Sequence, residues 1–341
     1  MIGTEFLNGQ GLGNQLFGYI SARCIAREMG EAFGTAGQEH LAVNVHSKKG
    51  MYFMELDLGE NIADPSSCTR YDEKDKRLYI ADCAHDLVHG CYIAGADEDI
   101  YKQHDDGKGL LIYGNLQAER YFGAYREEIC SWMQVKPEYD SGEYTADDIC
   151  VMNMRGGEYY GEHQLFLEKK YWTDAMRYMR SIRSDMKFVI VTDDVEAAAK
   201  LFPNIPAHHE ELAKDYVTVK NARYLILSNS SFGFFPAYTS STVKKIIAPK
   251  YWARHNVSDG FWSSEQNIYS IFSYMDRNGR LFTSDECRKE LASYDVSRCR
   301  IRHYDRSFDQ NSVTVQKQMK KDNRTALAQK AVWKIERMIG R

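Results

Sequence analysis

Apolar residues recur along this chain in a pattern that predicts strands alternating with helices. Near the N-terminus, residues 3–8 predict a strand, a glycine-rich turn follows, and apolar positions at helical spacing over 16–29 predict a helix. After residue 148 the alternation is clearest: it predicts strands at 149–154, 188–191, 224–227 and 246–248, and helices at 171–183, 195–201 and 216–221. Strands separated by helices indicate parallel sheets with crossover helices.

The stretches between these two series divide the chain. Residues 34–106 mix polar runs with short apolar pieces and predict loops with a few strands or helices. A strand is predicted at 110–113 and one helix at 118–135, which ends before a proline. The polar stretch 136–148 is typical of a linker. We therefore expect an α/β protein with an N-terminal Rossmann-like domain at 1–140, a second at 145–300 and a basic helical extension at 301–341.

Length and composition agree with two globular domains. With 341 residues and 39.4 kDa, the chain exceeds the usual size of one hydrophobic core. A net charge of −4 and a pI near 6.2 give no general basis for binding nucleic acid. The eight cysteines have neither CxxC nor zinc-site spacing, which indicates free thiols. Because the sequence has neither a signal-peptide pattern nor an apolar run of about 20 residues, we expect a cytoplasmic protein.

The last part of the sequence is basic and amphipathic. Residues 315–341 contain eight Lys or Arg against Asp322 and Glu336, and their apolar residues fall near one helical face. Such a helix either packs on its own domain or lies on the inner face of the cytoplasmic membrane, where it would bring the protein close to a lipid-anchored partner. The sequence leaves both interpretations open.

The first group of candidate binding residues lies in the glycine-rich turn. Gly11 and Gly13 would let backbone N–H groups approach an anion at the start of a helix. Asn14 and Gln15 carry amides that hydrogen-bond to sugar or phosphate oxygens. A tight turn before a helix also uses glycine for steric reasons alone.

The second group follows the first strand of the C-terminal series. Arg155 comes directly after the strand predicted at 149–154, and the carboxyl ends of parallel strands are where α/β folds bind ligands. An arginine there can donate two N–H groups to a diphosphate and stabilise a leaving group. The alternative is a salt bridge from Arg155 to Glu158 or Glu162.

Two further strand ends carry polar side chains. Asp193 and Asp194 could bind a divalent ion or a nucleotide base, and Asp194 could also cap the next helix. Ser230 and Ser231 could bind a diphosphate or act as ordinary helix caps.

Several of these segments resemble the bacterial α-1,2-fucosyltransferases. Residues 11–17, GLGNQLF, are similar to the GGLGNQLFQYA signature of that family, with Gln10 in place of its first glycine. Similar segments follow in the family's order over roughly residues 3–270: GNLQAERYF at 114–122, YWTDAM at 171–176, VTDD at 191–194, NSSFGFF at 229–235 and IAPKYW at 247–252. The resemblance implies a GT-B fold, two Rossmann-like domains facing a cleft, and an inverting transfer from GDP-fucose without a metal or other cofactor.

The resemblance also implies roles for the candidate residues. Arg155, Asn14 and Glu158 would be catalytic. The donor would be bound by Gly11, Gly13, Asn14, Gln15, Asn153, Arg155, Asp193, Ser230, Ser231 and Phe232, with Asp193 on the guanine. The acceptor would be a galactoside O2 of a surface glycan or a lipid-linked oligosaccharide, placed mainly by the N-terminal half. Glu158 and Asp97 are conceivable general bases, and the spacing selects neither.

One motif departs from the family's HxRRGD pattern. Asn153 stands in place of the histidine, Gly156 in place of the second arginine, and Glu158 in place of the aspartate. These changes keep two alternatives open: a transferase that uses another GDP-deoxyhexose such as colitose, or a noncatalytic protein that binds sugar nucleotides or glycans. A nicotinamide dehydrogenase is disfavoured because GxGxxG is absent at residues 9–14.

Overall fold

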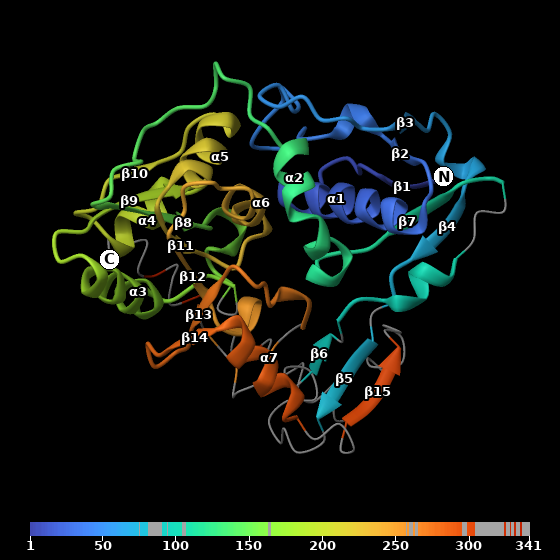
Figure 1. The fold of residues 1–341 in the computed structure, drawn as a ribbon. Coiled ribbons are helices and arrows are strands. Elements are labelled where there is room, and N and C mark those ends of the chain that lie inside the picture. Colours follow the sequence, from blue (N-terminus) through green and yellow to red (C-terminus); the bar gives the residue numbers. More distant parts are fainter. Residues whose placement is uncertain are drawn as a thin grey trace.

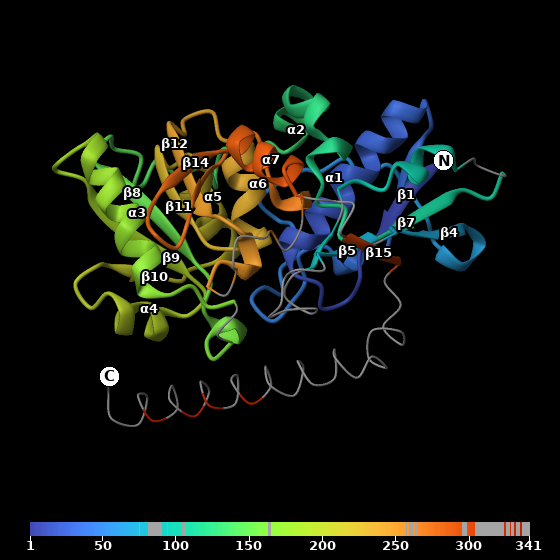
Figure 2. The ribbon, with the colours of Figure 1, turned by 90° about the horizontal axis from the view of Figure 1, so that it is seen from below.

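Two parallel sheets, each packed against helices, form the two halves of the protein (Figure 1). The structure is a computed structural model that describes residues 1–74, 76–80, 91–93, 95–103, 107–162, 165–256, 258, 262, 265–294, 299–303, 324, 328, 331 and 335. The predicted α/β class with two Rossmann-like halves is confirmed. Figure 2 shows the two halves side by side from another direction.

The N-terminal sheet has five parallel strands in the order β3-β2-β1-β7-β4. The predicted strand at 3–8 is shorter and ends before the glycine-rich turn, which leads directly into the long helix α1. The bounds are β1 (Ile2–Glu5), α1 (Leu12–Met29), β2 (Phe33–Ala36), β3 (Glu60–Asn61), β4 (Thr69–Asp72) and β7 (Leu110–Tyr113).

The C-terminal sheet has seven strands in the order β10-β9-β8-β11-β12-β13-β14, parallel except for the last pair. Its strands are β8 (Ile149–Met154), β9 (Lys187–Thr192), β10 (Ala207–His208), β11 (Tyr224–Leu227), β12 (Lys245–Pro249), β13 (Ser273–Met275) and β14 (Leu281–Thr283). Its helices are α3 (Lys169–Ile182), α4 (Val195–Leu201), α5 (Leu212–Asn221), α6 (Phe234–Tyr238) and α7 (Ser284–Ala292). From β8 the chain runs outward to β9 and β10 and then returns to the other side of β8 with β11, so a topological switch point lies between β8 and β11.

One segment differs from the sequence-based expectations. The single helix predicted at 118–135 is instead two short 3₁₀ turns, η4 (Glu119–Tyr121) and η5 (Gly123–Tyr125), followed by α2 (Arg126–Trp132). Gly123 falls inside the predicted helix, where glycine is unfavourable, and the backbone bonds there span three residues. The stretch 34–106 contains strands, including β5 (Lys76–Ile80) and β6 (Cys91–Ile93).

The chain returns to the N-terminal half after α7. Strand β15 (Cys299–His303) pairs antiparallel with β5, and β5 with β6, in a small third sheet at the bottom of Figure 1. The domain limits expected from the sequence stay a prediction. Beyond β15, the predicted helical extension lies outside the described residues except for residues 324, 328, 331 and 335, which are helical.

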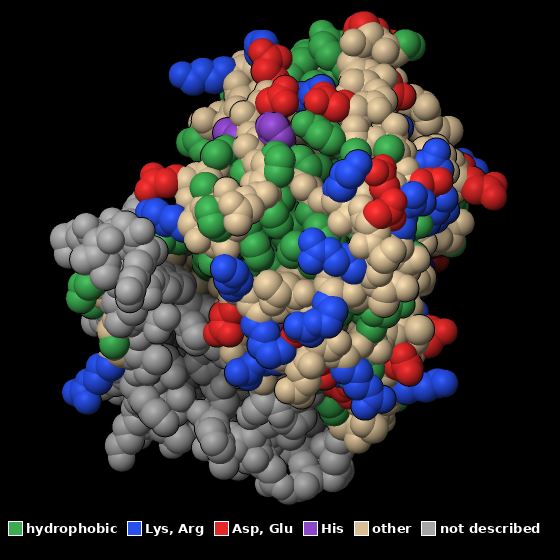
Figure 3. Space-filling model, turned by 90° about the vertical axis from the view of Figure 1, so that its left-hand side faces the viewer, with side chains coloured by type: hydrophobic (Ala, Val, Ile, Leu, Met, Phe, Trp, Pro, Cys, Tyr) green, Lys and Arg blue, Asp and Glu red, His purple; other side chains and the backbone are tan. Residues whose placement is uncertain are grey.

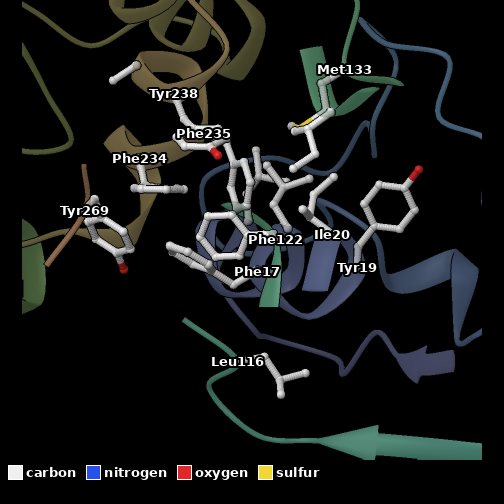
Figure 4. Close-up of a cluster of buried hydrophobic side chains, with 14 of the residues drawn as sticks. Phe17, Tyr19, Ile20, Leu116, Phe122, Met133, Phe234, Phe235, Tyr238 and Tyr269 are labelled. Carbon is white, nitrogen blue, oxygen red and sulfur yellow. The ribbon is translucent and has the colours of Figure 1, made fainter. Parts of the chain in front are cut away.

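An aromatic cluster joins the two halves in one core (Figure 4). Phe17 of α1 stacks on Phe234 of α6 with ring centroids 4.7 Å apart, and Phe235, Phe122 and Tyr269 surround it. All five rings are buried. The contact between α1 and the C-terminal half therefore rests on ring packing at the base of the cleft.

Two further features are the charges on one face of the protein and the apolar character of its helices. Figure 3 shows Lys and Arg side chains interspersed with Asp and Glu on the described part of this side of the C-terminal half. Among the described helices, none combines the length and apolar character needed to span a bilayer.

Candidate active site

A pocket lies where the carboxyl ends of β8, β9, β10 and β11 face the first turn of α1. The N-terminal half lines it with residues 11–14, Asn44 and His46. The C-terminal half contributes Asn153, Met154, Arg155, Glu158, Tyr159, Val191, Thr192, Asp193, His209, Leu212, Asp215, Ser230, Ser231 and Phe232. The pocket thus sits at the switch point of the C-terminal sheet, as α/β folds favour.

Arg155 lies at the carboxyl end of β8, where two carboxylates hold its guanidinium. Its guanidinium lies 2.8 Å from Asp193 Oδ2 and 2.9 Å from Glu158 Oε1. The Asp193 contact is ionic and lacks hydrogen-bond geometry, whereas the Glu158 contact is a hydrogen bond. The salt bridge to Glu158 considered as an alternative is therefore present. The Glu158 side chain is 73% exposed, so an incoming anion can replace Glu158 on Arg155 more easily than it can replace Asp193.

Asp193 holds the arginine and the loop after β8. Its Oδ1 accepts a hydrogen bond of 2.8 Å from the Gly156 backbone N–H, and its Oδ2 faces Arg155. Both oxygens are therefore engaged in the protein itself. In the structure, Asp193 positions Arg155; the guanine contact expected for it stays a prediction.

Asp194 has the structural role that was left open for it. Its Oδ1 accepts the backbone N–H of Ala197 at 2.9 Å and so caps α4, while its Oδ2 accepts the N–H of Gly157 at 3.2 Å. A β-carbon on Gly156 would lie 2.4 Å from Cβ of Asp194. This backbone therefore has no room for a side chain at position 156, which explains the glycine where the family pattern has an arginine.

The strand end after β11 approaches the first turn of α1. Ser230 caps the 3₁₀ turn η7 (Ser231–Gly233) by accepting the N–H of Phe232 at 3.3 Å, so its capping role is present. A β-carbon on Gly13 would lie 2.3 Å from the backbone carbon of Ser231. Gly13 thus permits the two halves to approach closely, which is the steric role considered for glycine in this turn. Ser231 and Phe232 line the pocket beside it.

The remaining predicted residues divide into those that line the pocket and those that do not. Asn14 is exposed there, and its Oδ1 accepts from Gln117 Nε2 at 3.3 Å. Asn153 also lines it, although it is only 5% exposed and its Nδ2 donates to the Val191 carbonyl at 3.4 Å.

Two of the candidate residues do not line the pocket. Gln15 is 2% exposed, donates to the carbonyl of His40 at 2.8 Å and accepts from the N–H of Ala42 at 2.8 Å, so its amide fixes a loop and does not reach the pocket. Asp97 is likewise buried outside the pocket, where it accepts from the Tyr71 hydroxyl and the Lys74 N–H at 2.8 Å each. It is therefore not placed to act as a general base.

Among the pocket residues that the sequence analysis did not predict are His46, His209 and Asp215. His209 Nδ1 lies 2.9 Å from Asp215 Oδ2, and His46 reaches the same place from the N-terminal half. Burial raises the pKa of Asp215, and burial followed by the charge of Arg155 lowers the pKa of His46. The only signal was the pair His208 and His209 at the end of a very short strand, β10, which the periodicity did not reveal.

Comparison with known proteins adds one sequence relative and several structures. No family model matches the chain. Over 175 residues, 45% of this chain and 60% of the relative, it is 25% identical to an α-1,2-colitosyltransferase of Escherichia coli, so it spans about three fifths of that relative's length.

Solved structures match at low scores. The α-1,6-fucosyltransferase NodZ soaked with GDP-fucose is 12% identical, with a TM-score of 0.43 over 83% of this chain and 99% of that one. POFUT1 in complex with GDP is 8% identical, with a TM-score of 0.42 over 72% and 97%. At these scores the fold rests on the topology above. The resemblance to α-1,2 sugar transferases that the motifs predict is confirmed by the colitosyltransferase, over 45% of this chain.

Proposed function

We propose that this chain is an inverting glycosyltransferase that transfers a deoxyhexose from a GDP-sugar to a hydroxyl of a glycan. The observation that carries the proposal is Arg155, fixed by Asp193 at the switch point and facing the first turn of α1 across the pocket. A guanidinium in this position can take the charge of a departing diphosphate.

The reaction would be a single displacement. An acceptor hydroxyl oxygen attacks the anomeric carbon, the bond from that carbon to the phosphate oxygen breaks, and its electron pair leaves with the diphosphate. The hydroxyl proton passes to a base or to solvent, and attack from the opposite face inverts the anomeric centre. Arg155 would stabilise the leaving group, and Asn14 would contact the sugar. The phosphate would replace Glu158 as a partner of the Arg155 guanidinium. No metal is needed in this scheme.

The donor sugar is L-fucose or colitose. The family resemblance of the motifs supports GDP-fucose, with O2 of a galactoside as the acceptor position. The curated relative is named for colitose, and this favours a GDP-linked dideoxyhexose as the second candidate. Turnover of the two donors with a galactoside acceptor separates them.

Cellular placement belongs to the same proposal. We expect a cytoplasmic enzyme that acts on a lipid-linked oligosaccharide, with the basic residues near the end of the chain touching the inner face of the membrane. Binding to vesicles with and without anionic lipid tests that contact.

The deciding experiment is isothermal titration of GDP, GDP-fucose and UDP, without metal and again with Mg²⁺. We expect GDP binding that does not require metal and that Arg155→Ala weakens by about 2 kcal/mol, or roughly 30-fold. The matched control is Arg177→Ala, because Arg177 also pairs with an aspartate at 2.8 Å but lies on α3.

The other outcomes are equally informative. If UDP binds in preference to GDP, the donor assignment is wrong. If the wild type binds no nucleotide, the chain is not a transferase of this kind. If GDP binds without transfer or hydrolysis of any GDP-sugar, the noncatalytic alternative is correct.

A further inference from the structure

The order of the strands along the pocket indicates how a sugar nucleotide would be oriented in it. Arg155 follows β8 and Ser230 follows β11, so the groups suited to a diphosphate lie at the switch point. From there the described pocket extends within the C-terminal half only toward β9 and β10, and across the cleft toward α1. A sugar nucleotide is linear, with its diphosphate in the middle. If the sugar faces α1, the nucleoside must lie over the ends of β9 and β10.

His209 stands at that end of the pocket. It follows β10 directly, and its side chain is 37% exposed. Its Nδ1 faces the Asp215 carboxylate, which is 11% exposed and also accepts the N–H of Glu210 at 3.1 Å. A carboxylate on Nδ1 favours the tautomer with the proton on that nitrogen, which leaves Nε2 as a hydrogen-bond acceptor. The carboxylate therefore fixes the orientation of a ring that lines the pocket and is partly exposed there.

His46 lies against His209 from the other half of the protein. The two ring centroids are 6.2 Å apart and the rings are nearly perpendicular, at 84°. The turn that carries His46 is shaped by Asn44, whose Oδ1 accepts the N–H of His46 at 2.8 Å. An imidazole from each half thus borders the same end of the pocket.

The two loops that carry these histidines are tied together across the cleft. Lys49 Nζ lies 2.5 Å from Glu211, and the Tyr52 hydroxyl accepts the N–H of Ala213 at 3.2 Å. In sequence, both contacts come shortly after the histidines, at residues 49 and 52 after His46 and at residues 211 and 213 after His209. Contacts within the protein therefore hold the N-terminal loop beside the residues that follow β10.

We propose that the adjacent rings of His46 and His209, one from each half of the protein, together grip the nucleoside of the donor, and that Asp215 positions His209 for this contact. Nε2 of His209 accepts a hydrogen bond from a ribose hydroxyl or from the base, while Leu212 and Phe232 supply apolar surface for the ring system. The inference rests on the proposed GDP-sugar donor. The nucleoside would be contacted by both halves of the protein, whereas the diphosphate would be bound mainly by the C-terminal half.

The test compares GDP with inorganic pyrophosphate, which has the phosphates but no nucleoside. We expect His46→Ala and His209→Asn each to raise the Kd of GDP about tenfold, while the Kd of pyrophosphate stays within about twofold. The asparagine keeps an N–H for Asp215, so the buried carboxylate remains paired. The controls are Val45→Ala, next to His46 and 91% exposed, and His208→Gln, whose ring faces Tyr144 outside the pocket.

Each contrary result is distinct. An unchanged Kd of GDP in both variants overturns the grip, and so does an equal loss for GDP and pyrophosphate. A fall in kcat with an unchanged Kd would make His209 a proton acceptor instead. Absence of GDP binding in the wild type would refute the proposed function, whereas wild-type binding with unaltered variants would refute only the grip.

Discussion

At the scale of single residues, the two glycines of the first turn have different tasks. Gly13 lies where the first turn of α1 meets η7, and its added β-carbon would lie 2.3 Å from Ser231 and 2.5 Å from Phe232 backbone atoms. Gly11 has open space around the same position and a φ of −63°, which any residue adopts. The sequence predicted a binding role for both, but only the structure shows that Gly13 is required by packing.

A pair of variants tests this difference. Gly13→Ala must push the two halves apart, so we expect it to lower the free energy of unfolding by about 1–3 kcal/mol and to weaken GDP binding. Gly11→Ala should cost less than about 1 kcal/mol, the difference between glycine and alanine as an N-cap. Urea unfolding measures both. Equal losses in the two variants would show that the close approach to Ser231 is not a constraint.

At the scale of elements, the sequence predicted what local patterns encode. Helix α1, strands β8 and β9, and the polar residues at their ends follow from periodicity and from the rule that ligands meet strand ends, so Arg155 and Asn14 could be found. His46 and His209 could not, because their position depends on loops that cross the cleft. The misplaced Gln15 has the same origin, since its contact with the loop at His40 decides its place. The failed helix at 118–135 is a different case, because Gly123 lies inside it and glycine is unfavourable in a helix.

The N-cap of α4, Asp194, can be tested by substitution. Asp194 is the N-cap and also holds the loop after β8 through Gly157. Asp194→Ala should lower the free energy of unfolding by about 1 kcal/mol or more. Asp194→Asn should keep the cap, because its amide oxygen still accepts the Ala197 N–H, but it should lose the hydrogen bond from Gly157, because an amide nitrogen donates and does not accept. Thermal or urea unfolding compares the two. If asparagine costs as much as alanine, the cap contributes little and the contact of the second oxygen with Gly157 is what matters.

At the scale of the whole molecule, the aromatic cluster makes the two halves one unit. Phe17 belongs to the N-terminal half, yet its ring packs within 5 Å of the centroids of Phe234 and Phe235 in the C-terminal half, and one buried core spans both. Loops tied across the cleft by Lys49 and Glu211 add a second connection. We therefore expect a cleft whose width is set by packing, and unfolding in one cooperative transition in place of two.

Phe17→Ala tests that coupling. Removal of a fully buried phenylalanine should lower the free energy of unfolding by about 3–5 kcal/mol, and because the ring belongs to a shared core, both halves should lose stability together in a single calorimetric transition at lower temperature. Leu7→Ala is the control, since Leu7 is apolar but 45% exposed and should change little. Two separate transitions, with only one displaced, would mean that each half has its own core and that the aromatic contact merely docks them. In that case the cleft could open between the halves, and GDP should then raise the temperature of one transition alone.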